Sequence, residues 1–522
     1  MGKSSKPTDI ESRNVYRLLA AAAAAVHFFF CRHLIGPMAL DLDAVNLTYA
    51  IHTFDITKLS PHPPGYLPYV GLLRLVHAII GGDPLRSVQL TALLFSVGTV
   101  LLTPLIAERL GANVRLRTIV LFLAAIHPFL IFHGSDGQTH ASEGFVAALL
   151  FHTLAVPSDR RKTILLVGLL VALGTALRPS FLLMTTGPVV FVYRRNRGAL
   201  MMIAGMTLLC TAAWLIPTIL LTGGFEVWRL AHQAFIIDPF VDIGHKTLHS
   251  AFAVAVWSLL LVAPVLPAIL RIKTAPRILT RFIAFGMGPA VLFFLMTFVS
   301  EPGYLQAMVP LFLLLTGYLV YEFKRPLIAC ILALGVELGI LMLPPGAPLG
   351  MKLPTIQEMV QREVAAESML KAISGRVTPE HRLLFITDYD GIPLQRQLPL
   401  LRPHTDVLWA HRGPTGRVQS LSFGTAASAT PIPGPVTLAK GPPARFDTKR
   451  SYHYIVLDPM LTNETRSALS MVSRCPIPMQ TAKVMTYHVP TQCFSKGKVI
   501  LGGHTVTFGA LPIPGLRLPP TR

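Results

Sequence analysis

Two aspartates open the most informative stretch of the sequence. Asp41 and Asp43 stand two positions apart at the start of segment 37–86, which separates two apolar runs. Two carboxylates at this spacing lie on one side of an extended chain and diverge on a helix. The pair suits general-base catalysis or the binding of a cation. A helical pattern runs from Asp43 to about Ile51, so Asp43 is either a base near a helix N-terminus or only the N-cap of that helix.

The same segment continues with Ser-Pro-His-Pro-Pro-Gly-Tyr over residues 60–66. The consecutive prolines after His62 restrict the backbone and predict a rigid, extended turn. One interpretation is a loop that presents His62 and Tyr66 to a ligand. The other is a plain connector between two helices at the membrane interface.

Four further ionisable residues share a short stretch between two apolar runs: His133, Asp136, His140 and Glu143. His140 and Glu143 are three positions apart and share a helix face. The set could bind a divalent cation together with Asp41 or Asp43, contact a substrate, or form a hydrogen-bonded polar turn. Spacing does not decide among these, because a metal site needs a defined ligand geometry.

The composition places these residues in a membrane protein. The chain has 522 residues, 52% of them hydrophobic and 14% charged, with mean hydropathy +0.55. Soluble domains are about a quarter charged and disordered chains are poor in apolar residues, so both classes are excluded. Five cysteines exclude a disulfide scaffold. The net charge of +20 does not indicate nucleic-acid binding, because the basic residues form short clusters between apolar runs.

About eleven apolar runs approach the bilayer-spanning length of about 20 residues. They cover roughly 17–36, 87–107, 117–133, 141–156, 163–178, 180–193, 199–221, 250–270, 282–299, 304–321 and 326–343. Several are short, and 163–193 is alternatively one re-entrant unit. Every second connection is basic, which predicts a cytoplasmic N-terminus and, with an odd number of spans, an external C-terminal segment. The first run is expected to be an uncleaved anchor rather than a signal peptide.

This topology assigns the polar residues to one side. Asp41, Asp43 and His62 fall on the outer face, as do the set from His133 to Glu143 and three residues at span ends, Arg178, Glu301 and Tyr304. None of them was used to set the orientation. Acids avoid inner loops in any case, but this does not explain why the short outer turns 133–143 and 300–304 are so polar. Ionisable groups at membrane depth are costly and usually functional.

The sequence changes character after residue 345, and segment 346–522 contains no spanning run. Its pattern predicts a helix over 355–375, strands at 382–387, 404–410 and 452–457, a loop over 411–446 and a loose tail after about 500. We expect a small α/β domain outside the membrane. Asp388 and Asp390 follow a strand, where ligand sites occur, although an acidic turn is the simpler interpretation. Cys475 and Cys493 are the only cysteines there and could form a disulfide.

The first-loop residues resemble a known family. Asp-x-Asp, a short helix and then His-Pro-Pro-Gly-Tyr resemble the polytopic glycosyltransferases of the GT-C fold, in the branch of protein mannosyltransferases and bacterial lipid A aminoarabinose transferases. Leu177-Arg178-Pro179-Ser180 and Glu301-Pro302-Gly303-Tyr304-Leu305 resemble later elements of the same family. The resemblance covers roughly residues 15–345 and implies a membrane module over 1–345. Ala44 departs from the family pattern, which leaves Asp41 as an alternative to Asp43 for the matching acid.

The resemblance implies transfer of a sugar from a polyprenyl-phosphate donor, with inversion, on the outer face of a membrane, here a bacterial inner membrane. Asp43 would be the general base, and Arg178 would stabilise the leaving phosphate, unless Arg178 only extends to the interface as an anchor. His62 and Tyr66 would bind donor phosphate or sugar, and His133, Asp136, His140, Glu143, Glu301 and Tyr304 would line the substrate cavity. The sugar, the acceptor and any divalent cation stay open.

Two other classes of function fit the sequence less well. A transporter or flippase of lipid-linked sugars would place its binding site near the membrane midplane, with broken helices and internal repeats. The polar residues here lie at one face instead, and Glu337 is the clearest acid within a span. A non-catalytic membrane scaffold with an outer domain would not need Asp43 or His62.

Overall fold

The computed structural model describes residues 7–36, 39, 42–58, 60–233, 275–297, 302–342, 359–360 and seven strand segments between 382 and 507. The chain divides into two compact units. The first comprises Met1–Gly36, Ala50–Ile56 and Pro63–Val360, and the second comprises Pro37–Tyr49, Thr57–His62 and Gln361–Arg522. The expected boundary near residue 345 stays a prediction, and the first loop is divided between the two units.

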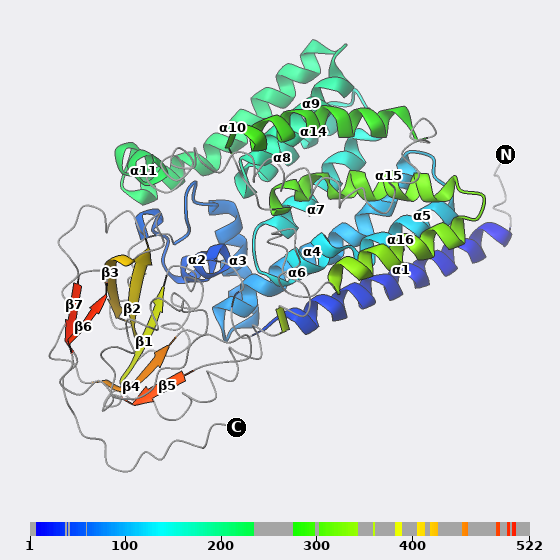
Figure 1. Cartoon of the computed structure of the whole chain (residues 1–522). Coiled ribbons are helices and arrows are strands. Elements are labelled where there is room, and N and C mark those ends of the chain that lie inside the picture. Colours follow the sequence, from blue (N-terminus) through cyan, green and yellow to red (C-terminus); the bar gives the residue numbers. More distant parts are fainter. Residues whose placement is uncertain are drawn as a thin grey trace. The chain divides into compact units, whose positions relative to one another are not determined.

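The first unit is helical (Figure 1). Its first helices are α1 (Pro7–Leu34), α3 (Leu67–Ile80), α4 (Pro84–Arg109), α5 (Val114–Ile126), α6 (Pro128–Ser135) and α7 (His140–Leu154). Its later helices are α8 (Arg161–Leu177), α9 (Ser180–Tyr193), α10 (Arg197–Thr222), α11 (Phe225–His232), α14 (Arg277–Thr297), η4 (Pro302–Met308), α15 (Val309–Tyr321) and α16 (Pro326–Leu341). Helix α2 (Leu42–His52) begins in the second unit and ends in the first.

Local sequence signals set several of these boundaries. Asp83 caps α4 by accepting a hydrogen bond from the backbone N–H of Leu85 at 3.0 Å. Asn113 caps α5 and Asn196 caps α10 in the same way. The predicted run 117–133 is divided into α5 and α6, which meet at an angle of 47°. Pro128 begins α6, and because proline lacks a backbone N–H it cannot continue the hydrogen bonding of α5.

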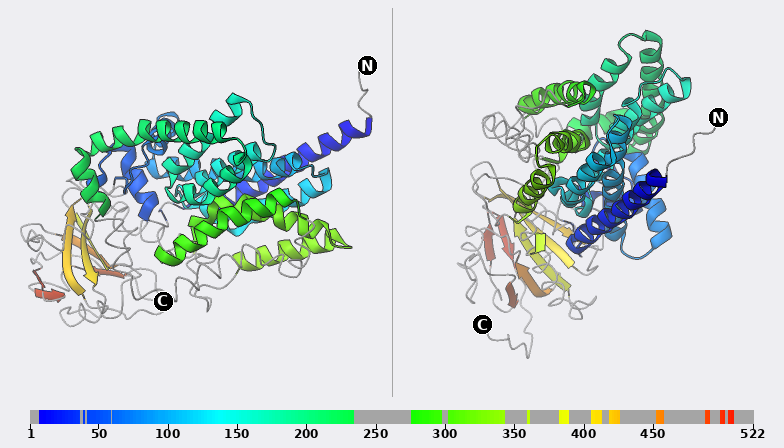
Figure 2. Two further views of the ribbon diagram at one scale, coloured as in Figure 1. Left: turned by 90° about the horizontal axis from the view of Figure 1, so that it is seen from above. Right: turned by 90° about the vertical axis from the view of Figure 1, so that its right-hand side faces the viewer.

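The core of this unit lies where α4 contacts α5, α6 and α7. A polar contact also joins these helices: His27 of α1 donates a hydrogen bond from Nδ1 to the Ala125 carbonyl, and its Nε2 lies 2.8 Å from the Ser96 hydroxyl. Figure 2 shows the long helix α10 along one side of the helical unit, where it packs on α8. Large apolar side chains of α10, such as Met201, Leu208 and Leu220, are exposed, as expected for a surface that faces lipid.

Four helices in the described part of the chain are long and apolar enough to cross a membrane, or five if the bent pair α5–α6 is one span. The four are Asn14–Leu34, Pro84–Arg109, Arg197–Thr222 and Gly303–Tyr321. The chain is therefore an integral membrane protein. The expected count of about eleven spans stays a prediction, because several helices are shorter and the run 250–270 lies outside the described residues.

The second unit contains a five-stranded sheet. The strands are β1 (Arg382–Asp388), β2 (Thr405–Arg412), β3 (Val418–Thr425), β4 (Tyr452–Leu457) and β5 (Tyr487–Pro490), in the order β3-β2-β1-β4-β5. Strand β1 pairs in parallel with β2 and β4, and the outer strands pair antiparallel. Strands β6 (Lys498–Leu501) and β7 (His504–Thr507) form a separate antiparallel pair.

Three predicted strands are present in this sheet, and two expectations were wrong. Strand β3 lies inside the stretch 411–446 that was expected to be a loop, and β6 and β7 extend past residue 500, where a loose tail was expected. The predicted helix 355–375 lies almost wholly outside the described residues, as do Asp390, Cys475 and Cys493. The α/β character of this segment therefore stays a prediction.

Candidate active site

The polar residues between α6 and α7 form a buried cluster. The turn from Asp136 to Thr139 joins the two helices, and Gly137 has a φ of 81°, a backbone conformation that favours glycine. His133, Asp136, His140 and Glu143 each expose 2% of their surface or less. Helix α8 and the 3₁₀ helix η4 both contact α7. Arg178 at the C-terminal end of α8 and Tyr304 of η4 therefore lie at the same cluster.

His133 and Asp136 form a close pair within the cluster. His133 Nδ1 lies 2.7 Å from Asp136 Oδ2, and Asp136 Oδ1 accepts a hydrogen bond from the backbone N–H of Gln138 at 2.8 Å. With Nδ1 donating to the carboxylate, a neutral imidazole has an acceptor at Nε2. This Nε2 is buried and has no hydrogen-bond partner among the described residues. The His133 ring lies 4.5 Å from the His140 ring, between their centroids.

Arg178 lies inside the protein, with 4% of its surface exposed. It ends α8, and Pro179 and Ser180 start α9 directly after it. Its Nε donates to Thr139 Oγ1 at 3.0 Å and its Nη2 donates to Gln138 Oε1 at 3.4 Å. These contacts contradict the interpretation of Arg178 as an anchor that extends to the membrane interface. The guanidinium is instead fixed in place. Its planar set of N–H donors matches the geometry of phosphate oxygens.

His140 and Glu143 occupy the first turn of α7. His140 Nδ1 lies 3.7 Å from Glu143 Oε2, and neither carboxylate oxygen of Glu143 has a hydrogen-bond partner in the described part of the chain. His140 precedes the apolar part of α7. Burial lowers its pKa well below the usual value, and the nearby Arg178 and His133 lower this pKa further. The His140 imidazole is therefore neutral at pH 7.

The 3₁₀ helix η4 closes the cluster. The Tyr304 ring lies 5.8 Å from the His140 ring, between their centroids. Gly303 passes so close to His140 that a Cβ atom there would overlap the imidazole. Gln306 is fully buried, and neither its amide nitrogen nor its amide oxygen has a hydrogen-bond partner among the described residues. Buried amide groups are normally paired, so these atoms are free to contact a bound polar molecule.

Asp43 and His62 form a pair of their own in the second unit. Asp43 is in the first turn of α2, inside the helix rather than at its N-cap. Its Oδ1 lies 3.3 Å from His62 Nδ1, and the two side chains are 27% and 17% exposed. These groups are therefore reachable from solvent, unlike the buried cluster. The structure brings together the two residues that the first-loop motif singled out, while Asp41 lies outside the described residues.

The remaining candidates have varied positions. Tyr66 is buried and precedes α3 with a φ of 45°, in the left-handed region. Gly65 beside it has a φ of 112° and lies against Thr218 and Ile56, which leaves no room for a larger side chain. Glu301 lies outside the described residues. Among the described residues no group of three or more His, Cys, Asp or Glu side chains could hold a metal ion.

Sequence reasoning missed four residues of the cluster. Gln138 and Thr139 lie between the predicted residues, and their place in a short polar turn was the available signal. Gln306 follows Tyr304 by two positions, which suggests no shared face in a helix. Tyr69 of α3 is fully buried, and its hydroxyl has no hydrogen-bond partner among the described residues. Its place in an apolar helix gives no sign of this.

Comparison with known proteins gives a fold but no sequence family. No family model matches the sequence, and no curated protein sequence does either. Among solved structures, the chain is similar to ArnT from Cupriavidus metallidurans in the apo state, with a TM-score of 0.56 and 12% identity over 89% of this chain and 95% of that one. ArnT bound to undecaprenyl phosphate matches with a TM-score of 0.55 and 14% identity over 89% and 96%. The oligosaccharyltransferase of Archaeoglobus fulgidus in complex with Zn and sulfate matches with a TM-score of 0.43 and 12% identity over 86% and 69%.

The helical unit and the similarity to ArnT define an integral membrane protein with the GT-C fold. The similarity to ArnT extends over nearly the whole length of both chains. The resemblance noted in the first loop is thereby confirmed at the level of the fold.

Proposed function

We propose that the chain is a membrane glycosyltransferase that moves a sugar from a polyprenyl-phosphate donor to a lipid, glycan or protein acceptor on the outer face of the membrane. One observation carries this proposal. In a GT-C fold, Arg178 is buried and held by Thr139 and Gln138. A fixed, desolvated guanidinium is suited to a phosphate leaving group. ArnT, which shares the fold, has been solved with undecaprenyl phosphate.

The proposed reaction inverts the anomeric carbon. The acceptor hydroxyl attacks that carbon, the bond from the carbon to the phosphate oxygen breaks, and the lipid phosphate leaves with the bonding electrons. Asp43 takes the proton of the hydroxyl. Its exposure allows an acceptor to reach it, and His62 Nδ1 at 3.3 Å restricts the orientation of the carboxylate. Asp41 is the alternative base. Arg178 stabilises the charge that develops on the leaving phosphate.

The buried cluster has a separate role in this proposal. His133 Nε2, the Glu143 carboxylate and the Gln306 amide lack hydrogen-bond partners among the described residues. We assign them to the sugar and phosphate oxygens of the donor, because sugar hydroxyls both donate and accept hydrogen bonds. The bulk of the bound lipid lies along apolar helix surface. We place the protein in a bacterial inner membrane, with its N-terminus in the cytoplasm and residues 346–522 outside.

Sugar transfer in membrane vesicles tests the proposal. Vesicles that contain the full chain are supplied with radiolabelled polyprenyl-phosphate sugars, and the wild type is compared with Asp43→Asn at matched protein levels. We expect label to reach an acceptor only with the wild type. Glu226→Gln is the matched control, since Glu226 is exposed and forms a surface ion pair with Arg229. Equal transfer by Asp43→Asn would remove Asp43 as the base and make Asp41→Asn the next variant.

A further inference from the structure

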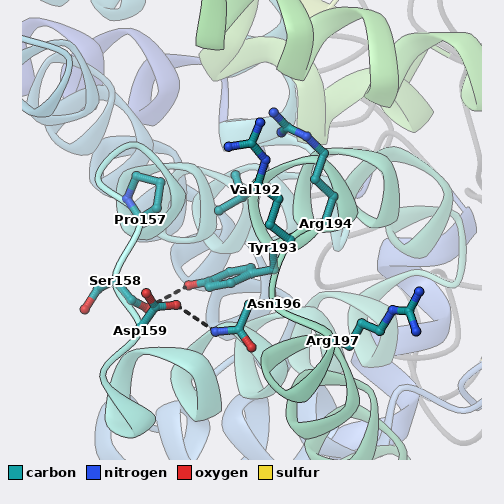
Figure 3. Close-up of a pocket in the computed structure, with 9 residues that line it drawn as sticks. Pro157, Ser158, Asp159, Val192, Tyr193, Arg194, Asn196 and Arg197 are labelled. Atoms are coloured by element: carbon teal, nitrogen blue, oxygen red, sulfur yellow. Dashed lines mark hydrogen bonds between the residues drawn. The ribbon is translucent and has the colours of Figure 1, made fainter.

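A pocket lies at the end of helices α8, α9 and α10 opposite Arg178. Arg178 stands at the C-terminal end of α8 and just before α9, whereas the pocket is at the start of α8, the end of α9 and the start of α10. It has a volume of about 670 Å³. Its lining includes segment 157–159 on one side and residues 192–197 on the other (Figure 3). None of these residues has a part in the proposed glycosyl transfer.

The pocket is built by contacts between its two sides. Asn196 donates from Nδ2 to Asp159 Oδ1 at 2.9 Å, and the Tyr193 hydroxyl donates to the Ser158 carbonyl at 3.4 Å. Figure 3 shows the Tyr193 ring between segment 157–159 and Asn196. These bonds hold the connection before α8 against the end of α9. The pocket is therefore formed before any ligand arrives, which reduces the cost of binding.

The charge of the lining is strongly positive. Arg194, Arg195 and Arg197 line the pocket, and Asp159 is the only acid among the described lining residues. Asp159 is bonded to the neutral amide of Asn196, and no ion pair joins it to these arginines in the described part of the chain. All three arginines are exposed. Three further exposed cations, Arg160, Arg161 and Lys162, directly follow the lining residues at the start of α8.

Two arginines contact one aromatic ring beside the pocket. The Arg194 guanidinium lies 4.4 Å from the centroid of the Phe191 ring, and the Arg281 guanidinium of α14 lies 5.1 Å from the same centroid. Planar guanidinium groups match phosphate oxygens and bind them by paired hydrogen bonds. A phosphate ester is therefore the ligand that this chemistry fits.

We propose that this pocket binds the phosphate group of an anionic phospholipid in the leaflet opposite the glycosyl-transfer site. Two features favour a lipid. Apolar side chains of the adjoining helices, such as Val190 of α9 and Met201 of α10, are exposed next to the pocket. The pocket is also at the ends of membrane helices, where basic residues meet lipid headgroups. A free phosphate is the other source of the same chemistry, and the experiment separates the two.

The test measures lipid binding by the full chain in an uncharged detergent. Short-chain phosphatidylglycerol, phosphatidylcholine and inorganic phosphate are titrated in parallel, and the rise in unfolding temperature gives each Kd. We expect phosphatidylglycerol to bind most tightly. In the variant Arg194→Gln/Arg195→Gln/Arg197→Gln, its Kd should rise by on the order of 100-fold, about fivefold for each arginine lost near the surface. Higher salt should also weaken binding to the wild type.

The matched control is Arg32→Gln/Arg86→Gln/Arg115→Gln, which removes the same charge from three exposed positions outside the pocket. Its Kd for phosphatidylglycerol should stay within about twofold of the wild type. A pocket variant that binds phosphatidylglycerol like the wild type would overturn the proposal. Equal binding of phosphatidylcholine would do the same. Inorganic phosphate that binds as tightly as the lipid would overturn the assignment to a lipid. Sugar transfer is not measured, so these outcomes are independent of the proposed function.

Discussion

The Arg178 guanidinium lies over the ring of Tyr304, with Cζ 4.8 Å from the ring centroid. The contact joins the end of α8 to η4, two elements that are more than 120 positions apart in the sequence. A desolvated cation over an aromatic ring is stabilised by about 2 kcal/mol or more, and an exposed one by about 0.5–1 kcal/mol. Tyr304 therefore helps to fix the position of the group that we assign to the donor phosphate.

The first prediction concerns Arg178. Arg178→Lys keeps the positive charge but loses the hydrogen bonds to Thr139 and Gln138 that orient the guanidinium group. We expect kcat/KM for the donor to fall about 10- to 100-fold, because hydrogen bonds to charged groups contribute about 1.5–3 kcal/mol. Kinetics with varied donor at fixed acceptor measure this. Unchanged donor kinetics in both Arg178→Lys and Arg178→Ala would remove Arg178 from the site.

The second prediction separates the ring of Tyr304 from its hydroxyl. Tyr304→Leu should lower donor kcat/KM roughly 2- to 30-fold, the range that corresponds to a cation–π contact of about 0.5–2 kcal/mol. Tyr304→Phe keeps a ring under the guanidinium and should stay close to the wild type. An equal loss in both variants would mean that the hydroxyl, rather than the ring, is the important group.

The third prediction concerns the packing of η4 on α7. A Cβ atom at Gly303 would overlap the His140 ring. Gly303→Ala should therefore lower the free energy of unfolding by about 1–3 kcal/mol, measured in detergent. Gly339→Ala in α16 is the control, because nothing lies within 4 Å of a Cβ atom there. It should be neutral or stabilise the helix by up to about 1 kcal/mol. Equal stability of the two variants would show that Gly303 does not contact His140.

The fourth prediction is the pH dependence of stability. The pKa of His140 is lowered in the folded state by burial, whereas the unfolded chain has the usual value of about 6.5. Above about pH 6.5 the imidazole is neutral in both states, and its contribution to stability is constant. Between that pH and the lowered pKa of the folded state, the unfolded state takes up more protons than the folded state, so folded stability falls by up to about 1.4 kcal/mol for each pH unit.

The comparison of wild type with His140→Gln isolates this effect from the other histidines. Unfolding temperatures measured from pH 7.5 to pH 5 should fall less steeply for His140→Gln than for the wild type. Parallel curves for the two proteins would contradict a buried, neutral His140.

Much of the helical unit could be predicted from its sequence because the signals are local. The apolar runs 87–107 and 199–221 correspond to α4 and α10. The N-cap residues Asp83 and Asn196 fix where these two helices begin. The bend inside 117–133 was missed because a uniform apolar run hides it, although Pro128 was the sequence sign of the break. Strand β3 was missed because its Ser, Gly and Thr residues are typical of loops. It forms through antiparallel pairing with β2, and this partner is not visible in a local pattern.

The candidate site was partly predictable for the same reason. His133, Asp136, His140 and Glu143 are close in sequence, and their close packing follows from one turn and two helix ends. The partners of Arg178 were not predictable, because Thr139 and Gln138 are about 40 positions away and their contact depends on how α7 and α8 pack. The motif residues Asp43 and His62 were recognised together through the resemblance, and the structure places them 3.3 Å apart.

The most direct measurement follows the sugar–phosphate bond of the donor. Purified full-length protein in proteoliposomes is given a polyprenyl-phosphate sugar labelled in both the sugar and the lipid, and the released polyprenyl phosphate is quantified together with the labelled acceptor. We predict that the wild type releases one lipid phosphate for each sugar transferred, and that Asp43→Asn and Arg178→Ala release little or none. Intact donor that crosses the bilayer with this bond unbroken would contradict the account and indicate a transporter of lipid-linked sugars.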